Sequence, residues 1–84
     1  MAEQISEVEL VVGSLSEIQE DGRVPRNVRL QIHGIVVSLK AGTELSIIVN
    51  KALNQLDEIS NDVNLQSYTR TQIWNIMSAL EKLH

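Results

Sequence analysis

The stretch Leu15-Ser16-Glu17-Ile18-Gln19-Glu20-Asp21 has a counterpart 41 positions later in Leu56-Asp57-Glu58-Ile59-Ser60-Asn61-Asp62, in which four of the seven residues are identical. The same shift aligns residues 3–39 with residues 44–80 and gives 11 identities in the 43 positions that overlap. Unrelated sequence would give roughly three, and self-similarity at a fixed period is typical of repeated supersecondary units. We therefore predict one domain, residues 1–84, that contains two copies of one unit.

Apolar residues recur at intervals of three and four along four segments of the chain, which is the spacing of one face of an amphipathic helix. This periodicity predicts helices over about residues 3–20, 25–40, 44–59 and 66–83. Asp21-Gly22 follows the first segment, and Gly readily takes the left-handed conformation after a helix. Short connections make the helices of each pair antiparallel neighbours. We predict an all-α fold, a four-helix bundle built from two duplicated helical hairpins.

The second segment is also compatible with a strand. Val28, Leu30 and Ile32 alternate with polar residues, and such alternation is typical of a half-buried strand. The repeat decides between the two structures, because the counterpart at residues 69–80 has a helical stripe and no sustained alternation. We therefore expect a helix in both places.

Composition sets limits on the class of protein. Eighty-four residues make one domain near the lower size at which a buried core suffices. A formal net charge of −4 argues against a general nucleic-acid binder, whose affinity comes largely from Lys and Arg. The absence of Cys excludes disulfides and thiolate metal sites. With no basic leader and no run of about 18 apolar residues, we expect a soluble cytoplasmic protein without membrane contact.

Three stretches resemble the signature sequences of a small uncharacterised archaeal protein family: Val24-Pro25-Arg26-Asn27-Val28-Arg29, Leu56-Asp57-Glu58-Ile59-Ser60-Asn61-Asp62 and Arg70-Thr71-Gln72-Ile73-Trp74-Asn75. The resemblance covers nearly the whole chain and implies a compact four-helix domain of unknown function. The chain departs from the family pattern at Val63 and Tyr68, where the resemblance implies Pro and often His. It carries no established active site over to this chain.

Each half of the chain is also similar, more distantly, to a HEAT-type helical hairpin. Arrays of that type need at least three units to bury a continuous core. Two units alone should therefore close into a bundle or pair with another copy of the chain.

Two pairs of oppositely charged residues recur at the two predicted turns, Asp21 with Arg29 and Asp62 with Arg70. A carboxylate in a turn accepts main-chain N–H bonds at the start of the next helix. An Arg two helical turns later can hold that carboxylate or the neighbouring turn. We interpret both pairs as structural.

A basic cluster, Arg23, Arg26 and Arg29, surrounds the start of the second predicted helix. Free N–H groups at a helix start attract anions, so these three residues are the anion-binding candidates. The alternative function that follows is an RNA- or phosphate-binding accessory protein. Local pairing with Asp21 and Glu20 is the simpler interpretation.

The interface candidates are Leu30, Gly34, Val37 and Trp74. The first three lie four and three residues apart on a second face of their helix. Such a face is either buried in the centre of the domain or an interface. Trp74 lies beside the core stripe of the last helix, and Trp is a favoured interface residue. We expect a protein partner, with a homodimer as one form.

Catalytic groups are few. The two His residues, His33 and His84, lack the spacing of a metal site, and no Ser or Gly lies in a nucleophile or phosphate-binding motif. We expect no catalytic residue, metal, cofactor or small-molecule substrate. The sequence therefore predicts a non-enzymatic helical protein that acts by binding protein or by self-association.

Overall fold

The computed structural model describes residues 2–42 and 44–83, with the side chains of residues 2–6 excepted. Four helices account for most of this part of the chain: α1 (Ala2–Glu20), α2 (Arg26–Lys40), α3 (Leu45–Ser60) and α4 (Ser67–Leu83). No strand occurs within the described ranges, so the strand interpretation of residues 28–39 is wrong. The prediction of four helices is confirmed, and every boundary lies within one residue of its expected position.

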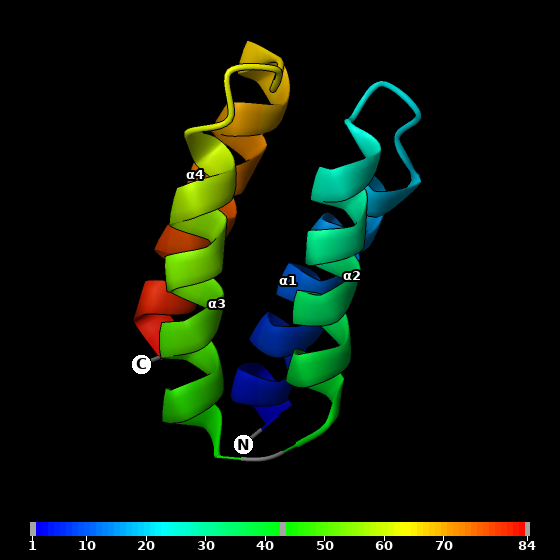
Figure 1. The fold of residues 1–84 in the computed structure, drawn as a ribbon. Coiled ribbons are helices and arrows are strands. Elements are labelled where there is room, and N and C mark those ends of the chain that lie inside the picture. The colour runs from blue at the N-terminus through cyan, green and yellow to red at the C-terminus, as the bar shows by residue number, and fades with distance from the viewer. Residues whose placement is uncertain (1, 43, 84) are drawn as a thin grey trace.

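The helices form a four-membered ring in cross-section. α1 packs against α2, α2 against α3, α3 against α4, and α4 against α1. The diagonal pairs, α1 with α3 and α2 with α4, have no Cα atoms within 8 Å of each other in the described part of the chain. Figure 1 shows the α1–α2 and α3–α4 connections at one end of the bundle, while the first turn of α1 and the last turn of α4 lie toward the other.

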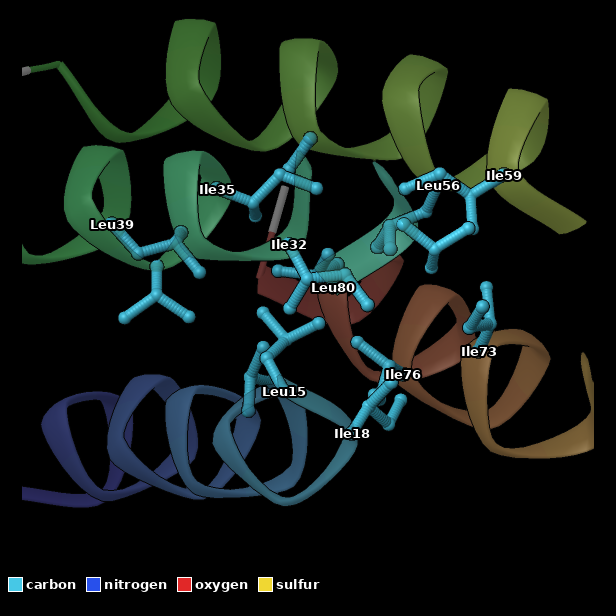
Figure 2. Packing of buried hydrophobic residues seen from close by; sticks show 14 of the residues in the cluster. Leu15, Ile18, Ile32, Ile35, Leu39, Leu56, Ile59, Ile73, Ile76 and Leu80 are labelled. Carbon is cyan, nitrogen blue, oxygen red and sulfur yellow. The ribbon is translucent and has the colours of Figure 1, made fainter. Parts of the chain in front are cut away.

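An aliphatic core fills the centre of the ring. Each helix contributes one stripe, and Leu15, Ile32, Leu56 and Leu80 are fully buried representatives, one from each helix. Figure 2 shows Leu80 from α4 beside Ile32 from α2 and Leu15 from α1. Since no aromatic side chain belongs to this core, its cohesion depends on interdigitated branched aliphatic groups.

The core extends into the two connections at one end of the bundle. Val24 and Leu65 are both buried although neither lies in a helix. These two residues are counterparts under the shift of 41, as are the buried pairs Leu15 with Leu56 and Ile32 with Ile73. The origin of the hairpins by duplication stays a prediction.

The end of α1 differs in detail from its prediction. Among the described glycines only Gly42, which follows α2, has a positive φ, of 74°. Gly22 does not have a positive φ, because two main-chain hydrogen bonds around Asp21 form the turn after α1 instead. The Asp21 N–H donates to Ile18 O at 3.1 Å, and the Val24 N–H donates to Asp21 O at 3.1 Å.

Candidate functional site

The two connections at one end of the bundle repeat the same hydrogen bonds. In the first, residues 21–25, Asp21 Oδ1 accepts the Arg23 N–H at 2.9 Å. In the second, residues 61–66, Asp62 Oδ1 accepts the Asn64 N–H at 2.9 Å. The Leu65 N–H also donates to Asp62 O at 3.1 Å, as in the first connection. Both carboxylates thus bond their own backbone two residues on, a turn typical of Asp and Asn.

Arg70 holds the second connection through main-chain carbonyls. Its Nε donates to Ser60 O at 2.8 Å, and its Nη2 donates to Asp62 O at 3.0 Å and to Leu65 O at 3.3 Å. Ser60 is the last residue of α3, where carbonyls have no acceptor role within the helix. Arg70 therefore joins the end of α3 to the beginning of α4, through the carbonyl of Asp62 rather than its carboxylate.

Arg29, the counterpart of Arg70, behaves differently. Its Nε is buried and has no hydrogen-bond partner in the structure. The carboxylate of Asp21 is bound instead by Arg23, whose Nε and Nη2 donate to Oδ1 and Oδ2, both at 3.1 Å. The expected Asp21–Arg29 pair is therefore not formed. Arg23 is only two residues from Asp21, and its planar guanidinium reaches both carboxylate oxygens at once.

The Asp21–Arg23 pair is the only salt bridge within the described residues. The side-chain hydrogen bond from Arg23, and then its main-chain N–H, lower the pKa of the Asp21 carboxyl below its ordinary value. A carboxyl whose pKa is lower in the folded state stabilises the fold above its unfolded-state pKa. That stabilisation is lost as the pH falls through the folded-state pKa. Because Arg23 is largely exposed, the pair contributes little to stability.

A small pocket lies between the last turn of α1 and the first two turns of α2. Its volume is about 370 Å³, and it is lined by Gln19, Arg26, Arg29, Leu30 and His33. Gln19 Nε2 lies 3.0 Å from His33 Nδ1, which connects the two helices across the pocket. Two of the three anion-binding candidates are therefore together.

The third candidate, Arg23, lies outside this pocket, and its guanidinium group forms a salt bridge with Asp21. Gln19 and His33 were not among the predicted site residues. One available signal was the spacing of Arg26, Leu30 and His33 at intervals of four and three on α2, which places them on one helix face. His84 lies outside the described residues.

The interface candidates occupy two separate places. Leu30 and Val37 are 61% and 53% exposed on α2, with exposed Gly34 between them. These three residues, called the α2 outer face below, lie opposite the buried stripe of Val28, Ile32, Ile35, Val36 and Leu39. Trp74 is exposed on α4, the diagonal partner of α2. The structure thus brings Leu30, Gly34 and Val37 together and leaves Trp74 apart.

A second hollow lies between α1 and α4, with a volume of about 360 Å³. Apolar residues Val11, Ile76 and Ala79 contribute to its lining together with Glu7 and Glu17. The described residues contain no group of three or more His, Cys, Asp or Glu side chains placed to hold a metal ion. None of the described helices is both long enough and apolar enough to cross a membrane.

Comparison with known proteins gives one family. The family model of UPF0147, an uncharacterised protein family, matches residues 1–83. A UPF0147 protein of Methanocaldococcus jannaschii is 46% identical over 70 residues, which are 82% of this chain and 75% of that protein. A UPF0147 protein of Archaeoglobus fulgidus is 40% identical over 76 residues, covering 90% of this chain and 87% of that protein.

A solved structure has the same fold. The crystal structure of "unknown function protein MMP1188" matches with a TM-score of 0.83 and 39% sequence identity, and the match covers 89% of this chain and 86% of that one. The resemblance to a small uncharacterised archaeal family is thereby confirmed, as is the helical fold.

Proposed function

Since this chain belongs to UPF0147, an uncharacterised protein family, we propose a function from its surface: it is a non-enzymatic module that binds a second copy of itself through the α2 outer face. The observation that carries the proposal is the exposure of Leu30 and Val37 on one side of α2. The two side chains lie on one side of the helix, two turns apart, and exposed apolar patches tend to mark protein interfaces. No cofactor or metal is part of this proposal.

Gly34 supports close approach of another helix. It lies between Leu30 and Val37, and a Cβ added to it would meet no atom within 4 Å. Nothing inside the domain therefore requires glycine at this exposed position, although glycine in a helix interior costs about 0.5–1 kcal/mol relative to alanine. A glycine at the crossing point of two α2 helices would let their axes approach and Leu30 and Val37 interdigitate.

A second copy is the occupant that we propose, because a two-fold axis can pair this apolar face with itself. Two α2 helices related by a two-fold axis near Gly34 place Leu30 of one copy against Val37 of its partner, an isologous contact. Arg26 and Lys40 are at the ends of α2, which contains no acidic residue. Their like charges limit affinity, so we expect a weak dimer that added salt strengthens by screening.

Val37→Glu is expected to weaken self-association at least tenfold, about 1.4 kcal/mol, because a dimer would bury the introduced carboxylate without a partner. Sedimentation equilibrium measures the dimerisation constant, and circular dichroism checks that the helices remain. Ile47→Glu is the matched control, since Ile47 is similarly exposed but lies on α3. A strictly monomeric protein at high concentration, or an equal effect of the two substitutions, would count against the proposal.

Gly34→Ala is expected to raise the stability of the monomer by about 0.5–1 kcal/mol and at the same time to weaken the dimer. The first effect follows from helix propensity and the second from a methyl group at the crossing point. Gly13→Ala is the control, because Gly13 is also exposed, lies within α1 and has no atom within 4 Å of an added Cβ. Thermal unfolding of dilute protein gives the stability. Equal dimerisation of the two variants would contradict the proposed crossing point.

A further inference from the structure

We propose that the pocket between α1 and α2, lined by Gln19, Arg26, Arg29, Leu30 and His33, binds an oxyanion group, a phosphate or a carboxylate, through the guanidinium groups of Arg26 and Arg29. This inference goes beyond the proposed self-association and rests on different observations. Leu30 is the one residue that the pocket and the α2 outer face share.

The first observation is the unused hydrogen-bonding capacity of Arg29. A guanidinium carries five N–H donors, yet the side chain of Arg29 forms no hydrogen bond or salt bridge with the described residues. Arg70, at the equivalent position of the second hairpin, uses its donors on three carbonyls. The same residue type at the same place in the fold therefore fastens the connection in one hairpin and has no hydrogen-bonding partner among the described residues in the other.

The second observation is that the nearby acidic group is already occupied. Asp21 is close enough to Arg29 for the guanidinium charge to lower the pKa of its carboxyl, but both of its oxygens accept hydrogen bonds from Arg23. None of the residues that line the pocket is acidic. The lining of the pocket therefore supplies no carboxylate to Arg26 and Arg29, and the nearby Asp21 carboxylate already has a hydrogen-bonding partner in Arg23.

The shape and chemistry of the pocket identify the ligand class. Two planar guanidinium groups match the oxygens of phosphate or carboxylate, which they bind through paired N–H donors. The pocket is an open hollow rather than an enclosed cavity, and three of its lining residues, Arg26, Leu30 and His33, are exposed, so it would hold the anionic group of a ligand and leave the rest in solvent. Leu30 gives it one apolar wall, and Gln19 with His33 forms a polar one. A single oxyanion group fits these features.

Side-chain NMR of arginine provides the test, with inorganic phosphate and acetate titrated separately into the full chain at low ionic strength. We expect a saturable shift of the Arg29 Nε–H signal and none of the Arg70 Nε–H signal, since Arg70 already donates to carbonyls. Tighter binding of phosphate would indicate a phosphate-bearing ligand, and tighter binding of acetate a carboxylate. Sodium chloride should weaken binding of either anion, whereas it strengthens the proposed dimer.

Three variants make the test specific. Arg29→Gln and Arg26→Gln should each weaken anion binding at least tenfold, about 1.4 kcal/mol. Lys51→Gln is the control, because it removes an exposed positive charge on α3, outside the pocket, and leaves the Asp21–Arg23 pair intact; it should leave affinity unchanged. Arg26 is exposed, so its variant remains informative if Arg29→Gln does not fold. No saturable shift of Arg29 with either anion, or an equal loss in Lys51→Gln, would overturn the proposal.

Discussion

Leu80→Ala is expected to lower the free energy of unfolding by about 3–5 kcal/mol. Leu80 is 0% exposed and lies in Figure 2 between side chains of other helices, among them Leu15 and Ile32. The substitution removes apolar surface from the core and leaves a cavity, because neighbours held on separate helices relax only in part. A small domain has about 5–15 kcal/mol of stability in all, so a large part of the total would be lost.

Urea unfolding followed by circular dichroism measures this effect, at protein concentrations low enough that self-association does not contribute. Leu10→Ala provides the control, because it is the same chemical change at a side chain that is 70% exposed. It should change the stability by less than about 0.5 kcal/mol. If both variants lost the same stability, the placement of Leu80 at the centre of the bundle would be wrong.

Much of the fold could be predicted because burial follows the helical period. Leu80 and Ile32 belong to stripes visible in the sequence, and both are fully buried. Leu65 extends the apolar stripe of the last helix backwards, but Val24 was harder, since it lies in a short connection with no periodicity to mark it. Its burial results from the way that two helices meet at a turn, which is a property of tertiary packing.

The candidate site could be predicted only in part, for a different reason. Arg29 and Arg70 are identical residues at equivalent positions, and the sequence alone assigns both the same structural role. The neighbours decide otherwise: Arg23 binds Asp21, while Asn64, its counterpart, has no charge with which to bind Asp62. Which carbonyl lies within reach of a guanidinium depends on backbone geometry at the tenth-of-an-ångström level, and periodicity does not contain that information.

Arg70→Met is expected to destabilise the domain by about 2 kcal/mol, because hydrogen bonds from a charged donor contribute about 1.5–3 kcal/mol. Methionine retains an unbranched apolar side chain, so packing of the stem changes little, while three carbonyls lose a donor. Of these, Ser60 O and Asp62 O lie at 2.8 and 3.0 Å from the guanidinium nitrogens. Urea unfolding at neutral pH measures the change in stability. The substitution should also increase the rate of amide hydrogen exchange more at residues 61–66 than in the rest of the chain.

Arg29→Met is the matched comparison, and its expected effect is smaller than about 1 kcal/mol or even stabilising. Arg29 forms no hydrogen bond that the substitution could remove, and its buried Nε has no partner, so the loss of a charged group relieves a desolvation cost. Equal destabilisation by the two variants would show that Arg29 also holds its connection, and it would remove the asymmetry from which the anion site is inferred. A large effect of Arg70→Met beside a small one of Arg29→Met would instead separate a structural arginine from one whose donors are available to a ligand.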